Sequence, residues 1–217
     1  MDKGLLLVIS GPSGTGKGTV CKKLCEQNPS LYYSISATSR PPRRGEKDNV
    51  NYFFLTEEQF LELREKDAFL EWARVYDNYY GTPSQKVQEK LNKGYDVILE
   101  IDTQGAKQVK NIAKEAVFIF LLPPSMEDLW LRIKGRGTDG QEVIEKRFAA
   151  AHHELQEIEN YDYVVINDNV SEAVCKIEAI LLAEKCSLIR NEDVLSRLVE
   201  EGDKIDLSLH RRNVKKG

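Results

Sequence analysis

The segment GPSGTGK, residues 11–17, fits the phosphate-loop pattern G-x-x-x-x-G-K. It stands between an apolar run and a charged, helix-like segment, which is the context that this pattern requires. Glycines let successive backbone N–H groups turn inward toward phosphate oxygens, and a helix that starts near Lys17 adds its unpaired N–H groups. We therefore predict a phosphate-binding loop in which the Lys17 ammonium reaches the β- and γ-phosphate oxygens.

The predicted nucleotide contacts in this loop are Gly11, Pro12, Ser13, Gly14, Thr15, Gly16, Lys17, Gly18 and Thr19. Position 18 departs from the usual pattern, which has Ser or Thr after the lysine to bind Mg²⁺. Gly18 has no hydroxyl, and Thr19 follows one place later. Because Mg²⁺ keeps several waters readily, we expect phosphates and water to hold it, with Thr19 as the one nearby hydroxyl able to help.

A second group of phosphate donors follows in residues 36–52. Four basic residues and a single Glu lie between Arg40 and Lys47, and Pro41 with Pro42 opposes helix, so the arginines belong to an ordered loop. Arginine binds phosphate bidentately, and Ser or Tyr hydroxyls add neutral donors. Beside a phosphate loop, we interpret the segment as a second anion site rather than a solvated basic loop. Its candidates are Ser36, Arg40, Arg43, Arg44 and Tyr52.

Two carboxylates, Glu100 and Asp102, follow the apolar run of YDVILEIDTQG. In parallel α/β sheets, ligands bind at the carboxyl ends of strands. Acids at that edge can hold Mg²⁺ through water or accept hydrogen bonds from a base. A capped strand-to-helix turn would explain Asp102 alone, but not its occurrence together with a phosphate loop.

A third basic segment contains WLRIKGRGTD and EKRF, which supply Arg132, Arg136 and Arg147. Arginines on a mobile segment can stabilise the charge on a transferring phosphoryl group. Glycines at 135, 137 and 140 suit a lid over about 132–147 that closes and excludes water. Two phosphates in line with fixed cations need no covalent enzyme intermediate.

Apolar strands alternate with helical patterns along the chain, which predicts an α/β fold with a parallel sheet. The predicted strands are Leu5–Ile9, Tyr32–Ile35, Tyr95–Ile101, Ala116–Leu122 and Tyr163–Ile166. Helix start signals are a capping box of Thr56 with Gln59, Pro83 with Ser84 before an end at Gly94, and Ser125 with Asp128. We also expect a long helix through about Asn160 and a short one in NEDVLSRLVEEG.

These patterns divide the chain into a core, an insertion and an extension. Residues 1–35 and 82–186 form the predicted core with its lid, and 36–81 form the insertion. Residues 187–217 are an extension of unknown role that ends in basic residues.

Composition limits the classes of function for this chain of 217 residues. The net charge of −4 argues against a general nucleic-acid binder, and no apolar run is long enough to span a membrane. The N-terminus lacks a signal-peptide pattern, so we expect the protein in the cytoplasm. We also expect a monomer or a homodimer. Cys21 and Cys25 are spaced for one helix face; a metal or redox pair is possible, but small buried hydrophobic residues are the favoured interpretation.

The chain resembles guanylate kinases over residues 4 to about 186. The matching motifs are S-x-x-x-R-x-x-R-x-G-E (Ser36 to Glu46), NYFF, FLEWARVYDNYYGTP, ILEIDTQGA and LRIKGRGTD, in the family's order and spacing. The resemblance implies a P-loop kinase with a parallel-sheet core, an inserted mixed α/β subdomain that binds the nucleoside monophosphate, and an Arg-rich lid. It also implies that ATP and Mg²⁺ are used to convert GMP, or dGMP, to the diphosphate.

The resemblance implies a role for each matching residue. The GMP phosphate would be held by Ser36, Arg40, Arg43, Tyr52 and Tyr80. The base would be read by Glu71, Thr82 and Asp102, because a carboxylate accepts from both N1–H and the exocyclic amine of guanine, whereas adenine offers an acceptor there. The catalytic cations would be Lys17, Arg40, Arg132, Arg136 and Arg147, with Asn167 at the adenine and with Thr19, Glu100 and Asp102 near Mg²⁺ through water.

Two alternatives remain at this point. The chain could phosphorylate another nucleoside monophosphate, or it could be an inactive guanylate-kinase-like module that binds proteins. Such modules are expected to lose phosphate-loop or lid residues, and Lys17, Arg132, Arg136 and Arg147 are all present.

Overall fold

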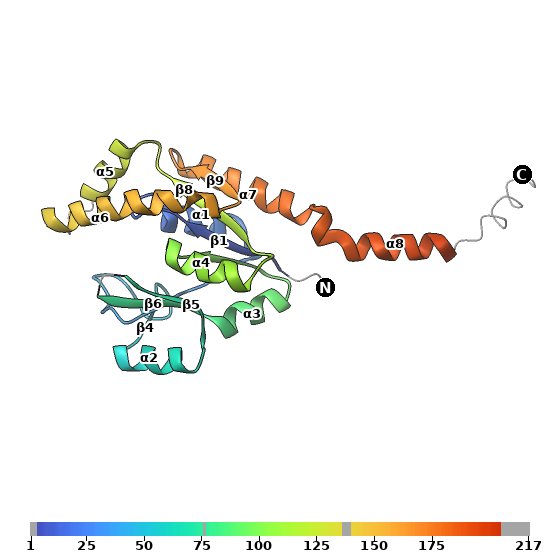
Figure 1. The fold of residues 1–217 in the computed structure, drawn as a ribbon, viewed down its shortest axis with the longest axis horizontal. Coiled ribbons are helices and arrows are strands. Elements are labelled where there is room, and N and C mark those ends of the chain that lie inside the picture. The colour runs from blue at the N-terminus through green and yellow to red at the C-terminus, as the bar shows by residue number, and fades with distance from the viewer. Residues whose placement is uncertain (1–3, 76, 136–139, 205–217) are drawn as a thin grey trace, which may run out of the picture. The chain divides into compact units, whose positions relative to one another are not determined.

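The computed structural model describes residues 4–75, 77–135 and 140–204, so Arg136 lies outside the described residues. The chain divides into two compact units, Met1–Glu178 and Ala179–Gly217, which are described separately (Figure 1). All the candidate site residues named above belong to the first unit.

A five-stranded parallel sheet forms the core of the first unit. In spatial order its strands are β2 (Leu31–Tyr33), β7 (Asp96–Glu100), β1 (Leu6–Ser10), β8 (Val117–Leu122) and β9 (Tyr163–Ile166). The five predicted strands are confirmed to within two residues at each end. Because all strands are parallel, the segments that follow β1, β7, β8 and β9 meet at one edge of the sheet.

Helices cover this sheet because its central strands are apolar throughout. They include α1 (Lys17–Gln27), α3 (Ser84–Asn92), α4 (Thr103–Ile112) and α7 (Val170–Lys185). Val87 of α3 and Val109 of α4 pack in one cluster with Val8, Leu99 and Phe118 of the sheet. The predicted helix after Pro83 is confirmed, and its chain turns at Gly94 with a positive φ of 81°.

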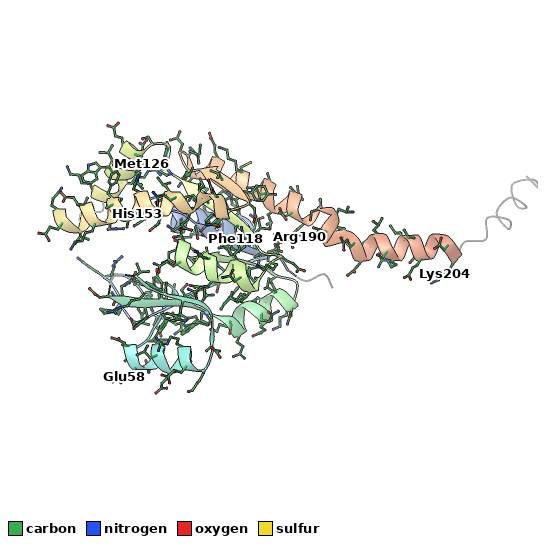
Figure 2. The ribbon with its side chains drawn as sticks, viewed as in Figure 1. Glu58, Phe118, Met126, His153, Arg190 and Lys204 are labelled. Carbon is green, nitrogen blue, oxygen red and sulfur yellow. The ribbon has the colours of Figure 1, made fainter. Side chains whose placement is uncertain are left out.

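A second sheet of four strands is built from residues 37–83. Its order is β4 (Phe53–Phe54), β3 (Ala37–Thr38), β6 (Asn78–Pro83) and β5 (Phe69–Val75). The helix α2 (Glu57–Glu65) packs on this sheet through Phe60, whose ring centroid lies 4.4 Å from that of Phe69. Glu58 faces outward (Figure 2). The predicted capping box of Thr56 and Gln59 is present at the start of α2.

A side-chain amide ties the two sheets together. Gln108 of α4 donates to the backbone carbonyl of Trp72 at 2.6 Å and accepts from its N–H at 3.2 Å. The amide therefore pairs with β5 as another strand would, and it fixes the distance between α4 and the second sheet.

Two helices after β8 carry the lid arginines Arg132 and Arg147. They are α5 (Met126–Lys134), which Ser125 caps as predicted, and α6 (Gln141–Leu155). Leu129, Ile133 and Ile144 pack between them. The expected long helix through Asn160 is wrong at its end, because α6 stops at Leu155. A 3₁₀ helix, η1 (Gln156–Asn160), follows and closes with the Tyr161 N–H on the Ile158 carbonyl.

The second unit holds the end of α7, the 3₁₀ helix η2 (Leu188–Asn191) and α8 (Glu192–Lys204), where the short helix was predicted. Leu195 and Leu198 of α8 are 50% and 56% exposed. Among the described residues, no helix has the length and apolar content to cross a membrane.

The four cysteines are free. Cys21 is buried in α1, and burial raises the pKa of the Cys25 thiol to about 11. Both observations fit the interpretation of the pair as small hydrophobic residues rather than reactive thiolates.

Candidate active site

The phosphate loop connects β1 directly to α1. Gly16 caps α1 in the left-handed region with φ 88°, and a Cβ at this position would lie 2.6 Å from Nδ2 of Asn167. The buried Thr15 hydroxyl donates to the Pro12 carbonyl at 2.9 Å and closes the loop on itself. A side chain at position 16 would be strained and would also displace Asn167, so the glycine is required on both counts.

The Lys17 ammonium lies over this loop. Its Nζ donates to the carbonyl oxygens of Gly11, at 2.5 Å, and Pro12, at 3.2 Å. These bonds fold the side chain back from the first turn of α1 to the start of the loop. The positive charge therefore lies beside the backbone N–H groups that the loop and the helix start provide.

Asn167 joins the loop to the end of β9. Its Nδ2 donates to the Thr15 carbonyl at 2.7 Å, and its backbone N–H donates to the Leu122 carbonyl at 2.8 Å. The side chain is buried, yet Oδ1 has no hydrogen-bond partner within the described part of the chain. Because buried polar atoms are nearly always paired, Oδ1 is an acceptor suited to a donor from a bound molecule.

Two of the lid arginines reach the same edge of the sheet. Nη1 of Arg132, in the last turn of α5, donates to the Asn167 carbonyl at 3.0 Å. Nη2 of Arg147, in α6, donates to the Ser13 hydroxyl at 2.6 Å. Residues far apart in sequence thus bring two guanidinium groups to the phosphate loop, and the third lid arginine, Arg136, lies outside the described residues.

Glu71 is a buried carboxylate on the second sheet. It is 4% exposed, and its Oε1 accepts a 2.6 Å hydrogen bond from the hydroxyl of Thr82, the residue opposite it on β6. Burial raises the pKa of Glu71 to about 7, and the charge of Asp102 adds to this effect while the Thr82 bond opposes it. A glutamate is usually solvated, and the β5–β6 pairing instead places Glu71 inside.

Asp102, the N-cap of α4, and Gly105, in its first turn, lie close to Glu71. The Asp102 carboxylate caps α4 by accepting from the Gly105 N–H at 2.8 Å. A Cβ on Gly105 would lie 2.4 Å from Oε2 of Glu71 and 3.5 Å from Oδ1 of Asp102. The glycine therefore allows two carboxylates, one from each sheet, to approach the same point.

The arginine loop presents one buried and one exposed guanidinium. Arg40 is 8% exposed, and its Cζ lies 5.1 Å from the centroid of the Tyr52 ring. The ring centroids of Tyr52 and Tyr80 are 6.0 Å apart. Arg43 is exposed. Ser36, which is half-buried, comes immediately before β3. Arg44, the remaining candidate of the second anion site, is exposed like Arg43.

Glu100 lies beside the phosphate loop, at the end of β7. Its Oε2 accepts a 2.6 Å hydrogen bond from the Tyr33 hydroxyl, and a Cβ on Gly18 would lie 3.4 Å from the same oxygen. Burial raises the pKa of Tyr52, and the Glu100 charge adds to this rise. The missing hydroxyl at position 18 therefore coincides with a nearby carboxylate, while Thr19 is exposed on α1.

One charged group near the site was missed in the sequence. Glu154 is half-buried near the end of α6, and burial raises the pKa of its carboxyl group, with Lys17 opposing this rise and Asp102 adding to it. It follows Arg147 by seven residues, two helical turns, so both project from one face of α6. That spacing is the signal that could have found it.

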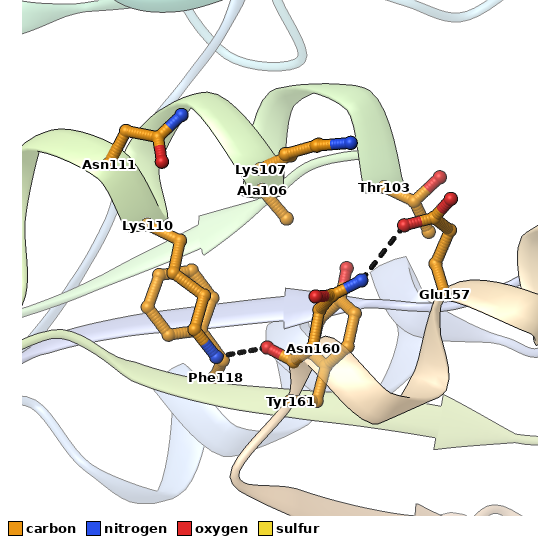
Figure 3. A pocket seen from close by; sticks show the side chains of 9 residues that line it. All are labelled: Thr103, Ala106, Lys107, Lys110, Asn111, Phe118, Glu157, Asn160 and Tyr161. Carbon is orange, nitrogen blue, oxygen red and sulfur yellow. Dashed lines mark hydrogen bonds between the residues drawn. The ribbon is translucent and has the colours of Figure 1, made fainter.

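A small pocket lies behind the site, between α4 and η1 (Figure 3). Lys110 donates to the Asn160 carbonyl there, and the Asn160 amide donates to Glu157 at 2.9 Å. Lys110, Asn160 and Glu157 are thus linked to one another. The Tyr161 hydroxyl also lines the pocket; it is buried and has no hydrogen-bond partner within the described residues.

The parallel sheet, the glycine loop before α1 and the arginines that converge on that loop define a P-loop α/β protein with a nucleotide site. A sequence profile described as Guanylate kinase matches residues 3–184. The guanylate kinase of Caldanaerobacter subterraneus subsp. tengcongensis is 58% identical over 92% of this chain and 97% of that relative. The guanylate kinase of Clostridioides difficile is 51% identical over 93% and 98%.

The fold agrees with these sequence matches. The crystal structure of guanylate kinase from Anaplasma phagocytophilum has a TM-score of 0.78 and 34% identity, and covers 94% of this chain and 98% of its own. The chain belongs to the guanylate kinase family. The expected fold class, a P-loop kinase with a parallel-sheet core, is confirmed, and the family membership favours a nucleotide kinase over an inactive binding module.

Proposed function

We propose that this guanylate kinase family member transfers the γ-phosphoryl group of ATP to GMP, giving ADP and GDP. The observation that carries the proposal is a buried carboxylate, Glu71, across from a phosphate loop with converging arginines. The loop supplies a site for one nucleotide, and the carboxylate supplies a base-reading group for another.

The guanine would be read by Glu71, Thr82 and Asp102. The Thr82 hydroxyl occupies one lone pair of Oε1 of Glu71, which leaves the remaining carboxylate lone pairs for N1–H and the exocyclic amine. Adenine carries an unprotonated N1 at the matching position. This acceptor would face the buried Glu71 carboxylate, which is also an acceptor, and both would be left unpaired. The expected selectivity therefore follows from unpaired polar groups rather than from size.

The GMP phosphate would be bound by Arg40, Arg43, Ser36, Tyr52 and Tyr80. Arg40 already packs against the rings of Tyr52 and Phe54, with its Cζ 5.1 and 5.7 Å from their centroids, so its donors need little reordering on binding. The exposed Arg43 completes the charge, and the tyrosine hydroxyls add neutral donors.

ATP would bind with its phosphates in the loop from Gly11 to Thr19. The Lys17 ammonium would bind the β- and γ-phosphate oxygens, and Oδ1 of Asn167 would accept a hydrogen bond from the adenine amine. Arg132, Arg136 and Arg147 would stabilise the charge that develops on the transferring group. Transfer needs the two phosphates in line and water excluded, with no covalent enzyme intermediate.

Mg²⁺ fits the donors beside the loop. Glu100 offers a carboxylate next to Gly18, and hard oxygen donors with retained waters are what this ion prefers. No group of three His, Cys, Asp or Glu side chains arranged for a metal occurs in residues 4–75, 77–135 and 140–204. We therefore assign Mg²⁺ to the phosphates and water, with Glu100, Asp102 and Thr19 acting through water; the ion supplies charge neutralisation of the phosphates.

The proposed setting is the purine nucleotide metabolism of the cytoplasm, with GMP, dGMP and ATP as partners. A coupled assay of ADP release with GMP, dGMP, AMP, CMP and UMP tests the proposal. We expect turnover with GMP and dGMP in the presence of Mg²⁺ and ATP. Absence of turnover with GMP would overturn it.

A further inference from the structure

Glu46 holds the guanidinium of Arg40 end-on. Its Oε2 accepts from Nη1 at 2.7 Å and its Oε1 accepts from Nη2 at 2.8 Å. Oε2 also accepts from the backbone N–H of Arg43 at 2.7 Å. One carboxylate therefore fixes the side chain of one arginine and the backbone of the other.

The remaining donors of Arg40 follow by counting. A guanidinium has five N–H donors, and Glu46 takes one from each Nη. The Pro41 carbonyl takes the second donor of Nη1 at 2.8 Å. This pairing leaves Nε–H and the outer Nη2–H, which are parallel and form the side of the fork that fits two oxygens of a phosphate. The Tyr80 hydroxyl, assigned above to the same phosphate, lies within hydrogen-bonding reach of this guanidinium.

The environment holds this orientation in place. Arg40 is buried, its Cζ lies over the rings of Tyr52 and Phe54, and its backbone N–H donates to the Thr38 hydroxyl at 3.3 Å. The bond from Arg40 lowers the pKa of Glu46, so the carboxylate is charged when it makes these contacts. A guanidinium without Glu46 would keep its place against the two rings but could turn within its plane.

We propose that Glu46 is a positioning residue for the monophosphate substrate, which sets the Arg40 fork so that its Nε–Nη2 side faces the substrate phosphate. The proposal rests on the function proposed above, because it takes Arg40 as a phosphate-binding residue. Glu46 acts through Arg40 and through the Arg43 backbone, and it touches no substrate atom.

The substitution Glu46→Gln tests this role. The amide keeps the size of the side chain but sets an NH₂ group against a guanidinium N–H, so the fork must turn. We expect KM for GMP to rise about tenfold, with KM for ATP changed by less than about twofold, because only the monophosphate meets Arg40. Glu46→Asp keeps both acceptor oxygens and should fall between the wild type and Glu46→Gln.

A double-mutant cycle separates positioning from a structural role. If Glu46 acts through Arg40, adding Glu46→Gln to Arg40→Ala raises KM for GMP by a smaller factor than Glu46→Gln does in the wild type, and an equal factor in both would contradict the positioning role. Glu62→Gln, which removes an exposed carboxylate of α2, is the matched control and should leave both KM values unchanged.

The outcomes are distinct. An unchanged KM for GMP in Glu46→Gln, or equal rises in both KM values with a lower melting temperature, would overturn the positioning role while leaving the proposed function intact. If Glu46→Gln does not fold, the same comparison is made with Glu46→Asp. A wild-type protein that does not turn over GMP would instead overturn the proposed function.

Discussion

The hydroxyl of Thr82 donates a 2.6 Å hydrogen bond to Glu71, and the two residues face each other across β5 and β6 inside the protein. The hydrogen bonds from the Thr82 side chain and backbone do not compensate the carboxylate for the loss of water, and the pKa of Glu71 is raised to about 7. The group that we assign to the guanine edge therefore changes its charge near neutral pH.

The first prediction concerns the pH dependence of GMP use. Guanine donates two hydrogens to this group, so the ionised form is the one that binds it. With a pKa of about 7, the ionised fraction of Glu71 rises about tenfold from pH 6 to pH 8. We expect kcat/KM for GMP to rise by a similar factor over this range, as measured in steady-state assays at constant ionic strength.

The phosphate of GMP also titrates near this range, so a control is needed. Glu71→Gln lacks the titrating group, and its pH profile reports the substrate alone. A wild-type profile that is parallel to the Glu71→Gln profile would contradict the assignment of the titration to Glu71.

The second prediction concerns stability. A carboxyl group whose pKa is raised by folding does not reduce the free energy of unfolding at a pH below its unfolded pKa, near 4.5. The reduction is fully present above about pH 7. Glu71→Gln removes this reduction and keeps an acceptor for Thr82. We expect the free energy of unfolding of Glu71→Gln, relative to the wild type, to increase by roughly 3 kcal/mol from pH 4.5 to pH 8. Urea denaturation at both pH values measures it, and an equal difference at both would refute it.

The third prediction concerns the close approach of α4 to Glu71. In Gly105→Ala, the new methyl group would lie 2.4 Å from Glu71 Oε2, so the carboxylate must move. We expect KM for GMP to rise about tenfold while KM for ATP is unchanged, since alanine favours the helix itself by about 1 kcal/mol. Gly202→Ala, in α8 with open space around it, is the matched control. Equal kinetics in both variants would show that the contact has no role.

The fourth prediction concerns Mg²⁺. Glu100→Gln keeps an acceptor for the Tyr33 hydroxyl but removes the charge beside Gly18. We expect the free Mg²⁺ concentration for half-maximal rate to rise about three- to tenfold, with the rate recovered at saturating Mg²⁺. A shift in Thr19→Ala with none in Glu100→Gln would identify the hydroxyl, rather than the carboxylate, as the group near the ion.

Local signals were sufficient to predict much of the fold. The apolar runs, the capping box of Thr56 and Gln59, and the turn at Gly94 act within a few residues, and the structure contains them where they were predicted. The end of α6 was misjudged because the helical pattern continues into residues 156–160, where the chain tightens to a 3₁₀ turn before β9.

The site depends on contacts that cross the sequence, which no local pattern reports. Asn167 meets Thr15, and Gly105 meets Glu71, only after the sheets have assembled. Only the resemblance to a family assigned Glu71 to the base. No role was predicted for the carboxylates of Glu46, which was noted only as part of a motif, and Glu154, because a Glu in a charged segment is usually solvated.

The selectivity of the wild type and Glu71→Gln for GMP over AMP, measured as the ratio of their kcat/KM values, is the decisive comparison. We predict a ratio above about 10³ for the wild type, because a site built on hydrogen bonds rejects a base that leaves them unpaired. In Glu71→Gln the ratio should fall at least about tenfold, with KM for ATP unchanged. An unchanged ratio in Glu71→Gln would contradict the assignment of base reading to this carboxylate.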